Sequence, residues 1–217
     1  MTKTLEQVPI FSGLSESELD ALVNCGAVKH YGKGTIIINE GDDTHSMYII
    51  LSGRAKVYLS DEEGKEVILN ALGPGQYFGE LSLLDDAPRS ASVVALEPCK
   101  LLLISEGTFR ECLASKPTVV FRILKDLCRR VRGLSENVKS LALLDVYGRI
   151  ARTLLDLGVE ENGKIVIKER LTHQDLANRV GASREMVTRI LRDLVVGGYI
   201  RMEGKHIIIN KRLPSEW

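Results

Sequence analysis

The chain has 217 residues and no net formal charge, with 44% hydrophobic and 27% charged residues. This apolar content excludes a disordered chain, and the longest apolar runs fall far short of the roughly 20 residues that a membrane-spanning helix needs. The charge is uneven: residues 1–115 carry 17 acidic against 9 basic side chains, and residues 116–212 carry 11 against 20. An acidic module joined to a basic one makes the second half a candidate for binding nucleic acid.

The N-terminal segment contains no apolar signal core, so we expect a cytoplasmic protein. The cysteines form no CxxC pair and are scattered at Cys25, Cys99, Cys112 and Cys128. This spacing predicts buried thiols in a reducing compartment and no metal or iron–sulfur site. The histidines are also scattered, which predicts surface side chains and no haem ligand; they are His30, His45, His173 and His206.

The first half of the chain predicts a β-rich domain. Ser15 and Glu18 have the spacing of a capping box and predict a short helix. Short segments rich in β-branched residues follow, separated by glycines, over 35–38, 47–51, 55–59, 67–71, 92–95 and 100–104. Many short strands at regular spacing are typical of a sandwich, barrel or roll.

The period of the apolar residues changes after Pro117. Steps of four and three residues connect Val120, Leu124, Leu127, Val131, Leu134, Val138 and Leu141. Such a narrow stripe favours the seam of a coiled coil between two copies of the chain, and therefore a homodimer. The alternative is an amphipathic helix lying on the core of its own domain.

The last third predicts a compact helical unit. A helix is expected over 146–157, followed by a polar turn over 160–163. Thr172 and Asp175 form a second capping box, for a helix that Gly181 ends.

A further helix begins after Ser183 and ends at Gly197, and strands are expected over 199–201 and 207–209. Two helices joined by a short turn and followed by a β-hairpin predict a winged helix-turn-helix. The outer face of the second helix carries Arg184, Glu185, Thr188, Arg189 and Arg192. These side chains suit the reading of base edges; the alternative is a solvated face with Glu185 paired to Arg189.

The segment Gly79–Ala91 stands out in the β-rich half. Gly79 allows a close approach of the backbone to a ligand, and a helical turn after it would present N–H groups to a phosphate. Arg89 would supply positive charge, and Glu80 would accept a hydrogen bond from a sugar hydroxyl. The alternative is a surface loop in which Arg89 pairs with Glu80 or Asp86.

These motifs together resemble the cyclic AMP receptor protein branch of the CRP/FNR family of bacterial transcription regulators, over essentially the whole chain. The matching segments are Gly79-Glu80-Leu81 with Pro88-Arg89-Ser90-Ala91, the strand signature around Gly41-Asp42 and Met47–Gly53, the stretch Leu141–Ala151, and Ser183-Arg184-Glu185 with Arg189-Ile190-Leu191. The resemblance implies an α+β protein with an N-terminal β-roll that binds cyclic nucleotides (1–115), a dimerisation helix (116–145) and a C-terminal winged helix-turn-helix (146–217).

The resemblance also implies roles for individual residues. Arg89 and Ser90 would bind the cyclic phosphate, Glu80 would bind the ribose 2′-hydroxyl beside the Gly79 and Leu81 backbone, and Ser135 would reach the base. For DNA, the implied base readers are Arg184, Glu185 and Arg189, and the implied phosphate contacts are Thr172, Gln174, Ser183 and Lys205. Leu134 and Thr44 depart from the family pattern: Leu134 replaces a threonine that contacts the adenine amino group, and Thr44 replaces a small residue.

The expected function is therefore a non-enzymatic, DNA-binding transcription regulator with a cyclic nucleotide effector, cyclic AMP first, and no metal. The expected partners are a palindromic operator with TGTGA-like half-sites, a second copy of the chain and RNA polymerase, with no membrane; the loop over 158–164 that would meet the polymerase is shorter than in the family archetype. Two alternatives remain: a regulatory subunit for another protein, and a family member that answers another effector such as cyclic di-GMP or acts without ligand. No hydrolase, zinc-protease or nucleotide-triphosphate motif indicates an enzyme.

Overall fold

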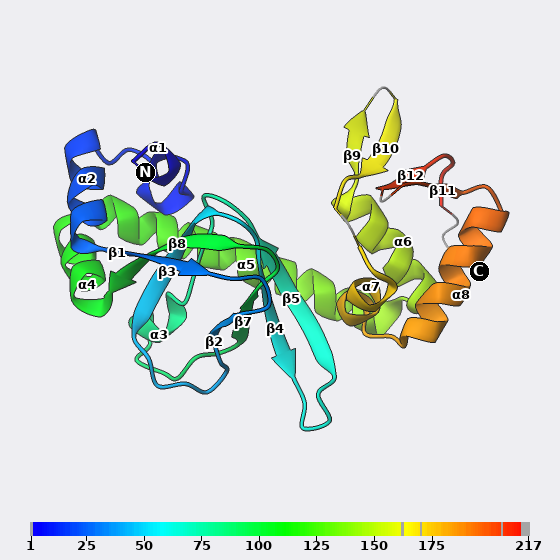
Figure 1. Cartoon of the computed structure of the whole chain (residues 1–217), viewed down its shortest axis with the longest axis horizontal. Coiled ribbons are helices and arrows are strands. Elements are labelled where there is room, and N and C mark those ends of the chain that lie inside the picture. The colour runs from blue at the N-terminus through cyan, green and yellow to red at the C-terminus, as the bar shows by residue number, and fades with distance from the viewer. Residues whose placement is uncertain (1, 162, 170, 205, 214–217) are drawn as a thin grey trace. The chain divides into compact units, whose positions relative to one another are not determined.

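The computed structural model describes residues 2–161, 163–169, 171–204 and 206–213, so Lys205 lies outside the described residues. The chain divides into two compact units, residues 1–131 and 132–217 (Figure 1). Within the described residues, no helix combines the length and the apolarity needed to cross a membrane. The three-part division at residues 115 and 145 stays a prediction.

The first unit is built from short strands with helices at both ends of its sequence. Its elements are α1 (Thr2–Glu6), the 3-10 helix η1 (Pro9–Phe11), α2 (Glu16–Cys25), β1 (Ala27–Tyr31), β2 (Ile36–Ile38), β3 (Ser46–Ser52), β4 (Ala55–Ser60), β5 (Glu66–Leu72), β6 (Tyr77–Phe78), α3 (Leu81–Leu84), β7 (Ser92–Ala95), β8 (Cys99–Ser105), α4 (Glu106–Ser115) and the first part of α5 (Pro117–Leu143). The strands form two antiparallel sheets, ordered β1-β8-β3-β6 and β2-β7-β4-β5. This arrangement confirms the predicted β-rich domain.

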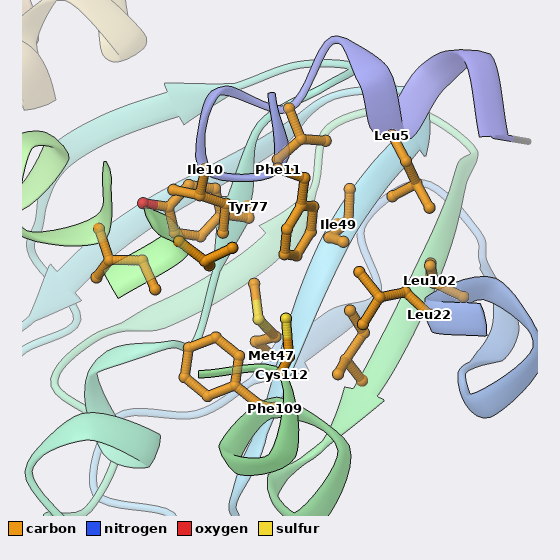
Figure 2. Close-up of a cluster of buried hydrophobic side chains, with 14 of the residues drawn as sticks. Leu5, Ile10, Phe11, Leu22, Met47, Ile49, Tyr77, Leu102, Phe109 and Cys112 are labelled. Carbon is orange, nitrogen blue, oxygen red and sulfur yellow. The ribbon is translucent and has the colours of Figure 1, made fainter. Parts of the chain in front are cut away.

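Strand β3 is covered on both faces, which explains its nearly continuous apolar sequence. Tyr48 and Ile50 belong to a buried cluster that also takes side chains from the second sheet. Met47 and Ile49 point to the opposite face, into a cluster built with the helices (Figure 2). In that cluster Phe11 from η1 and other helical side chains cover the sheet. The helices therefore cover the face of this sheet that points away from the second sheet.

Helix α5 has two apolar faces. Val119 and Ile123 are buried in the core of the first unit, and Leu127 packs partly against the same core. A second stripe is at least half exposed and consists of Leu124, Val131, Leu134, Val138 and Leu141. The heptad residues therefore divide between the two alternatives: Leu127 contributes to the core of its own unit, and the residues of the second stripe keep half or more of their surface exposed in the single chain.

The second unit contains the rest of α5, α6 (Val146–Leu157), β9 (Val159–Glu161), β10 (Lys164–Ile167), α7 (His173–Val180), α8 (Arg184–Val196), β11 (Ile200–Glu203) and β12 (His206–Ile209). Helices α6, α7 and α8 share one buried cluster with the sheet. Thr172 and Asp175 form the predicted capping box, and Gly181 ends α7 in the left-handed conformation. The winged helix-turn-helix is confirmed.

Three expectations are wrong. Glu160 and Glu161, expected in the polar turn over 160–163, belong to strand β9, which pairs with β10 in a sheet of order β11-β12-β10-β9, while Gly163 lies in the turn. Cys25 and Cys128 are exposed, because they lie on outer faces of α2 and α5, and only Cys99 and Cys112 are buried. Two of the histidines, His45 and His173, are half-buried and hydrogen-bonded.

Candidate ligand site and nucleic-acid interface

Gly79 allows the backbone before α3 to lie against the side chain of Arg89. Its φ is +81°, a conformation that residues with a Cβ rarely adopt. A Cβ at this position would lie 2.7 Å from Nη1 of Arg89 and 2.9 Å from the Ser46 carbonyl oxygen. The predicted glycine is therefore required by both conformation and space.

Arg89 is a buried cation, 4% exposed, held by four described neighbours. Its Nε donates to Oγ1 of Thr44 at 2.9 Å, and Nη2 donates to Oγ of Ser46 at 3.1 Å. Nη1 donates to the Gly79 carbonyl at 2.7 Å and to Oγ of Ser82 at 2.8 Å. Every one of these acceptors is neutral, and burial lowers the pKa of Arg89. A guanidinium buried without an ionic partner is costly unless an anion compensates it.

The surface-loop alternative is wrong, because the two carboxylates proposed as partners of Arg89 pair elsewhere. Asp86 pairs with Arg110 at 2.5 Å. Glu80, which is 1% exposed, pairs with Nη1 of Arg130 at 2.6 Å. Burial raises the pKa of Glu80, and the charge of Arg130 opposes that rise. Glu80 is thus a buried hydrogen-bond acceptor that forms an ion pair with a residue of α5.

Arg130 organises a second part of this site that sequence reasoning missed. Its Nε donates to Oδ2 of Asp126 at 3.0 Å, and the same oxygen accepts from the Tyr77 hydroxyl at 2.7 Å. The guanidinium also lies 4.8 Å from the centre of the Tyr77 ring. Burial and the bond to Asp126 raise the pKa of Tyr77. The network connects Glu80, at the N-cap of α3, to side chains of β6 and α5.

The other predicted ligand residues lie at less enclosed positions. Leu81 and Ser90 are exposed on the first unit. Leu134 and Ser135 lie on α5 within the second unit, and the Leu134 side chain is 50% exposed. The structure therefore brings Gly79, Glu80 and Arg89 together.

The outer face of α8 is hollowed, with a volume of about 400 Å³ lined by Arg184, Glu185, Thr188, Arg189 and Arg192. These are the five residues that the helical spacing grouped. Nη2 of Arg189 donates to the sulfur of Met186 at 2.8 Å, and the ion pairs of the described residues do not include Glu185 with Arg189. The hollow offers several cationic donors, which suit bidentate contacts to guanine.

Local contacts hold α8 against α7. His173 bonds through Nδ1 to Oγ1 of Thr188 at 2.8 Å. Ser183 caps α8 by accepting from the Met186 N–H, and Thr172 caps α7. Gln174 is exposed and donates to the Asn178 side chain at 2.7 Å. The expected phosphate contacts in the described residues thus lie at or near the first turns of both helices, where N–H groups are free for anions.

Known proteins match both units. Residues 28–116 match the family model of the cyclic nucleotide-binding domain, and residues 148–212 match that of the Crp-like helix-turn-helix domain. The CRP-like cAMP-activated global transcriptional regulator of Mycobacterium tuberculosis is 33% identical over 97% of this chain and 96% of the relative. The cAMP-activated global transcriptional regulator CRP of Salmonella typhimurium is 37% identical over 87% of this chain and 91% of the relative.

Solved structures extend the comparison. The Thermus thermophilus catabolite activator protein is 31% identical, with a TM-score of 0.57 over 93% of each chain. The c-di-GMP responsive global regulator CLP of Xanthomonas campestris is 25% identical, with a TM-score of 0.78 over 91% of this chain and all of the other. Fold, site and comparisons together define an effector-responsive, DNA-binding transcription regulator with a cyclic nucleotide-binding domain. The chain belongs to the CRP/FNR family of transcription regulators, which confirms the resemblance.

Proposed function

We propose that this regulator is a homodimer whose binding to a palindromic operator is controlled by a cyclic nucleotide, with cyclic AMP as the effector. The observation that carries the proposal is Arg89, a buried guanidinium whose described partners are all neutral. A phosphodiester anion is the ligand that such a cation favours.

The ligand would use the residues around Arg89 as follows. Its phosphate pairs with Arg89 and Ser90, and its ribose 2′-hydroxyl donates to Glu80, beside the backbone of Gly79 and Leu81. Glu80 suits this role because Arg130 pairs with the buried carboxylate and opposes the rise in its pKa, and an ionised carboxylate only accepts hydrogen bonds. The base is left to α5, where the family resemblance assigns contacts to Leu134 and Ser135.

The same helix supplies the route to DNA binding. The exposed stripe of α5 forms the seam of the dimer, and ligand binding shifts the equilibrium between arrangements of this seam. Soon after α5 ends, the Asp145 side chain caps the start of α6 by accepting a hydrogen bond from the Gly148 N–H. Arg149 of α6 donates to the carbonyls of Leu144 and Val180, and so ties the end of α5 to the end of α7. A change at the seam would therefore reorient α7 and α8 through this hinge.

On DNA, Arg184, Glu185 and Arg189 would read base edges, while Thr172, Gln174, Ser183 and Lys205 contact phosphates. Two symmetric units reach successive major grooves when half-sites are about 34 Å apart. TGTGA-like half-sites follow from the resemblance of α8, and RNA polymerase is the protein partner expected at promoters.

Calorimetric titration of the full-length protein with cyclic AMP, cyclic GMP and cyclic di-GMP tests the proposal. We expect binding of cyclic AMP, and a loss of at least about 100-fold in the Arg89→Gln variant, because charge-assisted contacts to phosphate contribute about 1.5–3 kcal/mol each. Arg110→Gln is the matched control: Arg110 is a nearby, half-exposed cation paired with Asp86 and Glu106. The affinity of Arg110→Gln for cyclic AMP should equal that of the wild type.

The variant should fold, because Arg89→Gln removes a buried charge whose hydrogen-bond partners among the described residues are all neutral. Binding of cyclic di-GMP without binding of a mononucleotide would refute the cyclic AMP assignment, in favour of an effector like that of the Xanthomonas relative. Full DNA affinity with no response to any of the three nucleotides would refute control by a cyclic nucleotide.

A further inference from the structure

His45 lies between the two hydroxyl residues that hold Arg89, Thr44 and Ser46, and its own side chain turns to a different neighbour. Its Nδ1 lies 3.2 Å from the carbonyl oxygen of Ser82, in α3. Its Nε2 lies 3.1 Å from Oδ1 of Asp43. The His45 side chain is 31% exposed, so both contacts form at the edge of the folded domain.

Both neighbours of the ring are acceptors, and this favours the protonated form of the ring. A backbone carbonyl can only accept, and so can an ionised carboxylate. A neutral imidazole has one N–H and one lone pair, so it satisfies one neighbour and turns a lone pair toward the other. Only the imidazolium form donates in both directions, and loss of the proton removes one of the two anchors of the ring.

The anchor on α3 is relevant to the ligand site because Ser82 contacts Arg89 directly. Oγ of Ser82 accepts from Nη1 of Arg89 at 2.8 Å, and the residue is 2% exposed. The peptide of Ser82 is held by His45 and its hydroxyl by Arg89, so a shift of α3 would change the environment of the guanidinium. The short segment from Thr44 to Ser46 thus fixes both the cation and the helix beside it.

We propose that His45 is a positioning residue for the phosphate site, and that its imidazolium form holds α3 in the geometry that binds the effector. Effector affinity then decreases as the pH rises and His45 loses its proton. This inference rests on the proposed function, because it concerns the affinity of the same site.

The charges around His45 favour the imidazolium form. The bond to the Ser82 carbonyl raises the pKa of His45 against the effect of burial, and the carboxylates of Asp43 and Glu106 raise it further. Glu106 at the start of α4 is itself paired with Arg110, which also pairs with Asp86. By linkage, a ligand that prefers the protonated site takes up protons on binding and raises this pKa again.

The experiment measures cyclic AMP affinity of the full-length protein by calorimetry from about pH 6 to about pH 8.5, in buffers of different ionisation enthalpy. We expect affinity at least about threefold higher at the acidic end, with net proton uptake on binding. The cyclic phosphate is a diester and keeps one negative charge throughout, so the ligand does not titrate. The cyclic AMP affinity of His45→Gln should change less with pH than that of the wild type, because the titrating imidazole is gone. His30→Gln replaces an exposed histidine of β1 and should show the pH dependence of the wild type.

Asp43→Asn should move the midpoint to lower pH, because an amide stabilises the imidazolium less than a carboxylate does. Glu80, whose own pKa is raised by burial, is common to all four proteins, so the comparison isolates His45. Identical pH profiles in the wild type and His45→Gln would overturn this inference and leave cyclic nucleotide binding intact. No binding at any pH would refute the proposed function and this inference with it.

Discussion

Replacing Arg130 by leucine should destabilise the first unit, because the variant leaves the Glu80 carboxylate buried without its cation. Glu80 is 1% exposed and pairs with Arg130 at 2.6 Å. Removing one partner of a fully buried pair costs about 3–5 kcal/mol, but the Arg130 side chain is 36% exposed and water can partly replace it, so we expect about 2 kcal/mol. For a chain of this length that loss lowers the Tm by about 4–8 °C.

The sign of the pH dependence follows from Glu80. Burial raises its pKa above the unfolded value of 4.5. A carboxyl with a raised folded pKa contributes stability below the unfolded pKa, and this contribution is lost as the pH rises through the folded pKa. Without Arg130 the pKa of Glu80 rises further. The difference in unfolding free energy between wild type and Arg130→Leu should therefore be small at about pH 5 and largest at about pH 8.

Thermal melts at fixed protein concentration measure this difference, since a dimer's Tm depends on concentration. Glu80→Gln combined with Arg130→Leu is the control, because it removes the charge that Arg130 would leave unpaired. Most of the lost stability should return in that double variant. Equal destabilisation at both pH values, or no recovery in the double variant, would show that Arg130 stabilises the fold by packing on Tyr77 and not by its charge.

In a randomised-site library, Arg189→Ala should reduce the preference for guanine by about 1–3 kcal/mol per contact, whereas Gln174→Ala should lower the affinity for all DNA sequences equally. Equal losses of affinity across sequences for both variants would contradict base reading by Arg189. Val138→Lys should dissociate the dimer in sedimentation without unfolding the separated chains, because Val138 is 64% exposed in one chain; a variant that stays dimeric would place the seam elsewhere. Leu134→Thr should strengthen cyclic AMP binding relative to cyclic GMP, because leucine leaves the adenine amino group unpaired at a cost of about 1–3 kcal/mol in a dry site; unchanged selectivity in calorimetric titration would refute this role.

Helix starts could be predicted from sequence because they are set by residues three apart. Ser15 and Glu18 form the capping box that their spacing predicted, and so do Thr172 and Asp175. The helix over 146–157 also begins and ends where expected. Each of these features depends on local hydrogen bonds, so no distant partner is needed to recognise them.

Strands that depend on distant pairing were missed. Strand β1 is mostly exposed and includes a lysine and a histidine, and it is a strand because it pairs with β8. Strand β6 has only two residues and pairs with β3. For β1 and β6, tertiary context outweighs local propensity. Strand β9 is a different case, because it pairs with β10 in a local hairpin, and two of its residues were assigned to the turn between the strands.

The site shows the same division between local and distant information. Gly79, Glu80 and Arg89 lie within one motif and could be identified from it. Arg130 lies 50 residues beyond its partner Glu80. The pattern of α5 drew attention to its apolar stripe, and an Asp126–Arg130 pair at i,i+4 looks like any solvated pair on a helix surface. Only the fold shows that this cation pairs with Glu80 of the candidate ligand site.

Leu134 links the two functions proposed for α5. It belongs to the exposed apolar stripe, and the family resemblance also assigns its position to the base of the effector. In the proposed complex Arg89 and Glu80 would contact groups that every cyclic mononucleotide shares, so discrimination between bases would come from this helix. A leucine favours the seam, because it buries more apolar surface between two chains than threonine would. It would offer the base no hydrogen bond, so we expect selectivity for adenine to decrease as the dimer gains stability. If Leu134 has both roles, effector selectivity and ligand-free dimer strength are coupled through one side chain, and a substitution that improves one should weaken the other.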